Sequence, residues 1–131
     1  MKTIVLSNGE LEVKEIENSL ENLQKIVGGY IEMPYISKVF IQNGIDMVIN
    51  EDGKFMDELK PQIAIIGKVN NQVLGIIYGN CIFVSHDDNG ETVGLNDKQI
   101  KVVMNELKLN VMLTHKDDGN EEQIVVKAMF I

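Results

Sequence analysis

The sequence predicts an α+β protein with a mostly antiparallel sheet, built from hairpins, and two short helices. Three observations lead to this prediction. Asn-Gly and Asp-Gly turn dipeptides separate extended apolar runs, and two segments combine helix caps with helical spacing of apolar residues. No linker or low-complexity tract divides the chain. We therefore expect a single domain over residues 1–131.

The chain opens with two extended runs joined by Asn8-Gly9, a dipeptide that supplies the positive φ angles of a tight hairpin turn. A short helix follows. Asn18 is placed to cap it, Glu21 lies three residues later as the reciprocal partner, and the apolar positions 20, 23, 26 and 27 share one face. Gly28 falls just past this run, where a left-handed residue ends a helix at little steric cost.

The middle of the chain is predicted to be strands. Pro34 interrupts an extended piece and indicates an edge strand or a strand end. Asn43-Gly44 and Asp52-Gly53 are further turn signals, so residues 39–55 are typical of an antiparallel meander. Residues 62–85 are nearly continuous apolar strand, and we expect them to form the most buried part of the sheet.

The second helix has the clearer signal. Asn96 caps it, Gln99 answers as the capping-box partner, and Leu95 can pack on Ile100 as a hydrophobic staple. Apolar residues follow at positions 100, 103, 104 and 107, which is helical spacing. The chain is then predicted to end in a hairpin over about 109–131.

Composition narrows the classes of function. The net charge is −8, and all 12 cationic side chains are lysines, with no arginine in the chain. Because arginine is the usual reader of phosphates and guanines, we expect no direct nucleic-acid binding. The acidic balance fits a solvated surface or a basic partner. No apolar run is long enough to span a bilayer, and a single buried Cys81 fits a reducing cytoplasm.

Two similar turns suggest metal binding as one interpretation. A divalent ion would use His86, Asp87, Asp88 and Glu91 in the first turn, or His115, Asp117 and Asp118 in the second. Neither turn has the spacing of a calcium loop or of a zinc site. Asp, Asn and Gly are also the residues that plain exposed turns prefer. The turn interpretation is favoured, and no cofactor is expected.

No nucleophile or phosphate-loop motif is present. Cys81 lies in an apolar string typical of a core, and Gly28-Gly29 follow a helix, so they cannot present a helix N-terminus to a phosphate. What remains is a set of aromatic and amide side chains near glycines. These could line a pocket that stacks a ring, or be half-buried strand residues: Tyr30, Tyr35, Tyr78 and Asn80.

Four stretches resemble the family known as domain of unknown function 3846: QKIVGGYIE, the turn NEDGK, GIIYGNCIFVS and LNDKQI. The resemblance covers about residues 1–108, and the helix–GGYIE junction and the NEDGK turn are its most distinctive parts. The chain departs from the pattern in FMDELKPQIA, which has no arginine. The hairpin over about 109–131 is an addition.

The resemblance implies a protein of bacteriophages and other mobile elements, without an assigned reaction. From it we expect a non-catalytic accessory protein of the bacterial cytoplasm that counteracts host defence. It would sequester a small signalling nucleotide, in a pocket at the interface of a homo-oligomer, or inhibit a basic host defence protein. The alternatives are a metal-dependent hydrolase, which requires His86 and His115 to converge, and a structural module that associates with itself.

Overall fold

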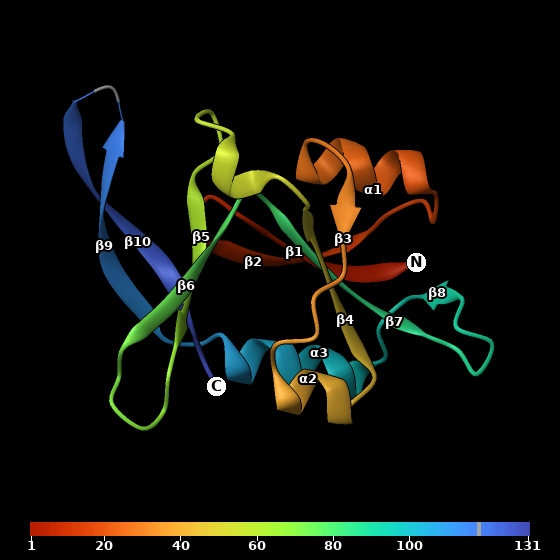
Figure 1. Ribbon diagram of the computed structural model, residues 1–131. Coiled ribbons are helices and arrows are strands. Elements are labelled where there is room, and N and C mark those ends of the chain that lie inside the picture. Colours follow the sequence, from red (N-terminus) through yellow and green to blue (C-terminus); the bar gives the residue numbers. More distant parts are fainter. Residues whose placement is uncertain (118) are drawn as a thin grey trace.

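The computed structural model describes residues 1–117 and 119–131, and it confirms the α+β class (Figure 1). The first sheet has the order β2-β1-β7-β4-β3, with β8 beside β7. Its strands are β1 (Lys2–Ser7), β2 (Glu10–Glu15), β3 (Ile31–Glu32), β4 (Ile45–Asn50), β7 (Cys81–His86) and β8 (Thr92–Val93). The helices are α1 (Leu20–Val27), α2 (Lys38–Gln42) and α3 (Asp97–Glu106), with a 3-10 turn η1 (Gly53–Phe55).

The second sheet has the order β6-β5-β10-β9, and its strands are β5 (Pro61–Ile66), β6 (Val73–Tyr78), β9 (Asn110–Asp117) and β10 (Asn120–Phe130). The predicted C-terminal hairpin is present, since β9 and β10 pair antiparallel. The other edge of β10 pairs with β5 in parallel. The last strand of the chain is therefore an interior strand of this sheet.

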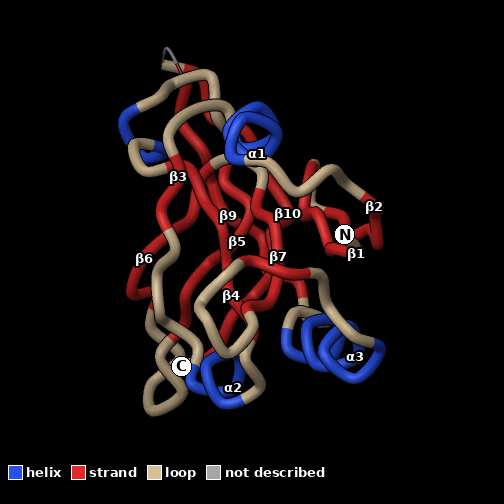
Figure 2. Tube along the Cα trace, turned by 90° about the vertical axis from the view of Figure 1, so that its right-hand side faces the viewer, coloured by secondary structure: helices blue, strands red, loops and turns tan. Residues whose placement is uncertain are grey.

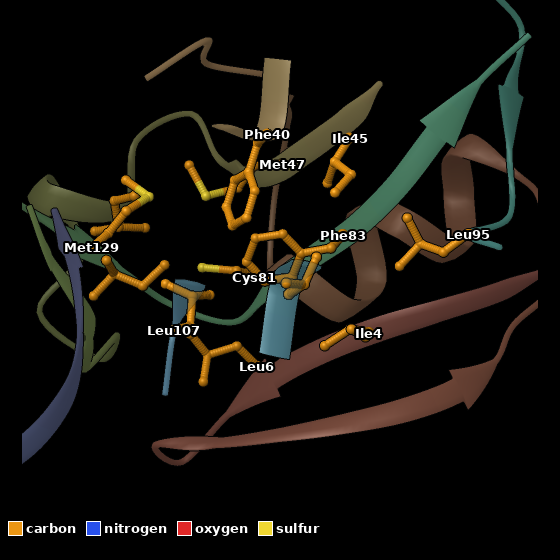
Figure 3. Packing of buried hydrophobic residues seen from close by; sticks show 13 residues of the cluster. Ile4, Leu6, Phe40, Ile45, Met47, Cys81, Phe83, Leu95, Leu107 and Met129 are labelled. Atoms are coloured by element: carbon orange, nitrogen blue, oxygen red, sulfur yellow. The ribbon is translucent and has the colours of Figure 1, made fainter. Parts of the chain in front are cut away.

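The main core lies between the two sheets, with α2 and α3 closing one end (Figures 1 and 2). Figure 3 shows its side chains converging from both sheets and both helices. The rings of Phe40 and Phe83 meet edge to face with centroids 5.6 Å apart. Met129 of β10 is fully buried in the same cluster, as is the free thiol of Cys81.

The opposite face of the first sheet is covered by α1. Leu23 and Val27 of this helix pack on Val5, Val48 and Ile82. Strand alternation explains this division, because neighbouring residues of β1, β4 and β7 point to opposite faces. Among the described residues, no helix has the length and apolar character needed to cross a membrane.

Three of the local signals predicted from the sequence are confirmed. Asn8 and Gly9 have φ angles of 52° and 77° and join β1 to β2. At α3, the Asn96 side chain accepts from Gln99 N at 2.8 Å, and the Gln99 side chain accepts from Asn96 N at 2.9 Å. Gly28 ends α1 with φ of 83°.

The predicted cap of α1 was wrong by one residue. Ser19 is the N-cap, and its hydroxyl accepts from Asn22 N at 3.1 Å. Asn18 instead donates to the carbonyl of Thr92, 2.8 Å away. The Asn18 side chain, which the local sequence pattern assigned to the helix cap, therefore makes a tertiary contact instead.

The predicted meander over residues 39–55 was also wrong in part, because residues 38–42 form the helix α2. The Ser37 hydroxyl caps this single turn by accepting from Phe40 N. Burial of Phe40 in the core outweighs the strand preference of the neighbouring apolar residues.

Residues 62–85 are not uniformly central. β7 is an interior strand with five buried residues, and β5 is interior to the second sheet. β6 is instead an edge strand whose Val73 and Leu74 are exposed. The ladder between β5 and β6 shifts register beside Gly75, as expected for a glycine within a strand.

Replacing Met129 by alanine should lower the free energy of unfolding by about 2–5 kcal/mol, the usual cost of truncating a buried methionine. The matched control is Met112→Ala in the same hairpin, since Met112 is 62% exposed, and it should change stability by less than about 0.5 kcal/mol. Urea unfolding measures both. Equal losses in the two variants would show that β10 does not contribute to the core.

Burial raises the pKa of the Cys81 thiol to about 12. Since the thiolate is the reactive form, iodoacetamide at pH 8 should leave Cys81 unmodified in the folded protein and alkylate it fully in urea. Mass spectrometry measures the two yields. Rapid alkylation without denaturant would contradict the burial of this thiol.

Candidate functional site

A cleft of about 430 Å³ lies where the turn after β4 meets the second sheet. Three segments distant in sequence form its walls: the stretch from η1 to β5, the end of β6, and the far part of β9. The lining residues are Lys54, Met56, Asp57, Leu59, Tyr78, Thr114, His115 and Lys116. Five of its lining residues are titratable, and two of these, Tyr78 and His115, are candidate site residues predicted from the sequence.

Gly53 sets the position of the first wall. A Cβ atom at this residue would lie 2.6 Å from the backbone oxygen of Tyr78. Only glycine therefore lets η1 pack directly against the end of β6. This close approach brings Lys54 to the side of Tyr78 in the cleft.

Asn50, at the end of β4, anchors the same turn to α1. Its buried side chain donates to the carbonyl of Val27 at 3.1 Å and accepts from Asp52 N at 2.8 Å. A Cβ atom on Gly29 would lie 2.9 Å from Asn50 Nδ2. Glu51 N also donates to the carbonyl of Tyr30. The GGYIE junction and the NEDGK turn thus form one structural unit.

Two lysines give the cleft a local positive charge. Lys54 Nζ lies 5.0 Å from the ring centroid of Phe55, and no described carboxylate is within 4.0 Å of it. Lys116 Nζ lies 3.4 Å from Glu121, but both side chains are largely exposed, so this pair holds the ammonium weakly. Asp57 is the carboxylate among the lining residues.

His115 adds a polar ring to the β9 wall. Its Nε2 is buried and has no hydrogen-bond partner among the described residues. Such an atom costs about 1–3 kcal/mol, and a turn of the ring toward an oxygen in the cleft would relieve that cost. Glu122 lies opposite His115 in the ladder. Its pKa is lowered, chiefly by the hydrogen bond that Lys60 donates to it at 2.6 Å, so this carboxylate is already engaged.

The structure separates the four residues predicted from aromatic and amide chemistry. Tyr78 is half-buried and lines the cleft. Tyr30 and Tyr35 are 72% and 70% exposed and lie outside it. Asn80 donates to the carbonyl of Ile26 at 3.1 Å, and so supports the end of α1.

The two predicted metal turns lie on opposite sides of the molecule (Figure 1). His86 Nδ1 is 2.9 Å from the buried carboxylate of Asp46. Asp87 accepts from two backbone amides of its own turn, and Asp88 is exposed. Among the described residues, no group of three or more His, Cys, Asp or Glu side chains lies close enough together to hold a metal ion. Asp118 lies outside the described residues, as does the side chain of Asp117.

Sequence reasoning missed Lys54, Lys116 and Thr114 as site residues. The lysines are 62 positions apart and each stands among acids, so no cationic cluster is visible along the chain. The one available signal for Lys54 was its place in the NEDGK turn. Lys116 and Thr114 had none, because only the pairing of β9 with β10 brings them to this cleft.

The contact between Gly29 and Asn50 predicts a non-additive pair. Gly29→Ala should cost about 1–3 kcal/mol, as overpacking usually does, because the new methyl meets the Asn50 amide. The cost should fall by half or more in an Asn50→Ala background, where that amide is gone. Urea unfolding of both single variants and the double variant measures the coupling. Additivity within about 0.5 kcal/mol would contradict the contact.

Comparison with protein families matches residues 1–108 to the family described as domain of unknown function (DUF3846). The match ends between α3 and β9, so the hairpin that completes the second sheet lies beyond it. Comparisons with the curated proteins and with the solved structures find no match. The matched region includes the GGYIE junction and the NEDGK turn, which the Asn50 hydrogen bonds join. The chain therefore belongs to the DUF3846 family.

Proposed function

We propose that this chain is a non-catalytic binding protein that sequesters a small phosphorylated signalling molecule, a nucleotide, in the cleft beside Tyr78. The observation that carries the proposal is the meeting of Lys54, Lys116 and His115 with this tyrosine in one concave site. The chain has a net charge of −8, yet this cleft is lined by two lysines and one carboxylate.

The lining chemistry suits such a ligand. Lysine ammonium groups bind phosphate as mobile point charges and need no bidentate geometry, so the absence of arginine does not exclude the interaction. The ring of Tyr78 offers an apolar face with a polar end. Thr114 adds a hydroxyl that can donate to a phosphate oxygen. Ligand sites commonly combine a concave shape with a few polar groups of this kind.

The overall negative charge does not prevent binding of an anion. At physiological ionic strength charges are screened beyond about 8 Å, so the groups that line the cleft, Lys54, Lys116 and Asp57, act on a ligand more strongly than the distant acidic surface does. The same screening means that affinity should decrease as salt is added. The acidic surface elsewhere would help to exclude nucleic acids, which are much larger polyanions.

In the mobile-element setting that the resemblance implies, binding of this kind would counteract host defence. A protein that holds a nucleotide without converting it lowers the free concentration of that nucleotide. In a bacterium that uses nucleotide signals to activate its defences, this removal would keep the defence inactive. Inhibition of a basic defence protein by the acidic surface is the second mechanism expected from the sequence, and the experiment below separates the two.

Calorimetry with cyclic mononucleotides, cyclic dinucleotides and ADP-ribose tests the proposal. Lys54→Met should weaken binding of the ligand about tenfold or more, since a hydrogen bond to a charged group contributes about 1.5–3 kcal/mol. The matched control is Lys101→Met on the exposed surface of α3, which removes the same charge far from the cleft and should leave affinity within twofold.

Failure of the wild-type protein to bind any nucleotide of this panel would refute sequestration. Salt-sensitive recovery of a basic protein from extracts of a bacterium with active defence systems would then favour the inhibitor mechanism. Equal weakening by the two lysine variants would show that net charge, and not the cleft, determines affinity.

A further inference from the structure

A second cleft of about 350 Å³ adjoins the first and shares Lys54 and Tyr78 with it. It runs between the β3–β4 edge of the first sheet and β6 of the second. Its walls are mainly apolar, with Pro34, Ile36, Ile49, Ile65, Ile76 and Ile77 among the lining residues. We call it the apolar groove, and the first cleft the cationic cleft.

The apolar groove is lined by two carboxylates and one lysine, whereas the cationic cleft is lined by one carboxylate and two lysines. Glu32 and Glu51 line the apolar groove, and both residues are exposed at its opening. Carboxylates accept hydrogen bonds from hydroxyl or amino groups and repel phosphate. A ligand that spans the two clefts would therefore be oriented, with its anionic group toward Lys116 and its uncharged, donor-bearing part toward the glutamates.

Gly75 is the reason that the groove is open along β6. A Cβ atom at this position would meet only Ile65 Cδ1, at 3.6 Å, which is an ordinary van der Waals distance. Its φ angle is not among the positive ones. The backbone therefore does not require glycine here, and the missing side chain leaves room that a ligand can occupy.

We propose that the two clefts form one bipartite site for a nucleoside phosphate. The phosphate lies in the cationic cleft, the base lies in the apolar groove, and Glu32 or Glu51 accepts from the ribose hydroxyls. Tyr78 and Lys54 stand at the junction, where the sugar meets the phosphate. This inference rests on the proposed function, since it assigns the two parts of the sequestered ligand to two places.

Calorimetry with ADP, inorganic pyrophosphate and adenosine tests the assignment. The wild-type protein should bind ADP at least tenfold more tightly than pyrophosphate, because only ADP fills the groove. Gly75→Val should fold, since a β-branched residue suits a strand. It should reduce ADP affinity to the level of pyrophosphate and leave pyrophosphate affinity within twofold.

Two further variants keep the test decisive. Gly75→Ala adds one methyl at the ordinary distance noted above, and it should reduce ADP affinity about threefold even if the valine variant does not fold. Leu74→Val is the matched control, because Leu74 is an exposed neighbour of Gly75 on β6 and is not among the lining residues of the groove. It should leave the affinities for ADP and pyrophosphate unchanged.

Equal wild-type affinities for ADP and pyrophosphate, with neither affinity changed by substitution of Gly75, would overturn the bipartite site. That result would leave anion binding in the cationic cleft intact. Absence of binding for ADP, pyrophosphate and adenosine alike would overturn the proposed function for this ligand class together with the inference. Loss of pyrophosphate binding in Gly75→Ala would also overturn the assignment, because the phosphate would then lie in the groove.

Discussion

The buried amide of Asn50 is the constraint on which the candidate site depends. It donates to the carbonyl of Val27, the last residue of α1, and accepts from the amide of Asp52 in the turn after β4. Gly29 leaves space for that amide, and Gly28 ends the helix in the left-handed conformation that turns the chain toward β3. The two glycines, whose sequence resembles a phosphate loop, therefore serve the packing of α1 against the turn after β4. Any effect that they have on a ligand is indirect.

The turn that Asn50 fixes carries Lys54, which lines the candidate cleft. Gly53 packs against the backbone of β6, so Lys54 comes to Tyr78, and the following stretch forms a wall opposite β9. The other wall comes from the hairpin beyond the family match. In this chain the match supplies Lys54 and Tyr78, whereas the hairpin supplies Lys116. A relative with a different C-terminal segment would present different groups at the same place.

The sequence predicted those parts of the fold whose cause is local. The Asn8-Gly9 turn and the capping box of Asn96 depend on neighbouring residues alone, and both are confirmed. The helix around Phe40 could not be predicted in this way, because one turn of apolar residues is stabilised by the core that it enters. The parallel pairing of β10 with β5 joins segments about 60 residues apart, and no periodic pattern of apolar residues in the sequence indicates which strands pair. The candidate site likewise depends on contacts between distant segments. Tyr78 was therefore the one lining residue predicted from the sequence to bind a ligand, whereas His115 was predicted as a candidate metal ligand.

The proposed site for a phosphorylated ligand lies where the NEDGK turn, β6 and β9 meet. Backbone amide NMR during titration with a bound nucleotide tests it most directly, because it maps contacts without any substitution. The account predicts that the largest shifts fall in residues 53–59, 75–78 and 114–116, and that the β1–β2 hairpin is unaffected. Shifts concentrated in that hairpin, or around His86 and Asp46, with none at these three segments, would contradict it.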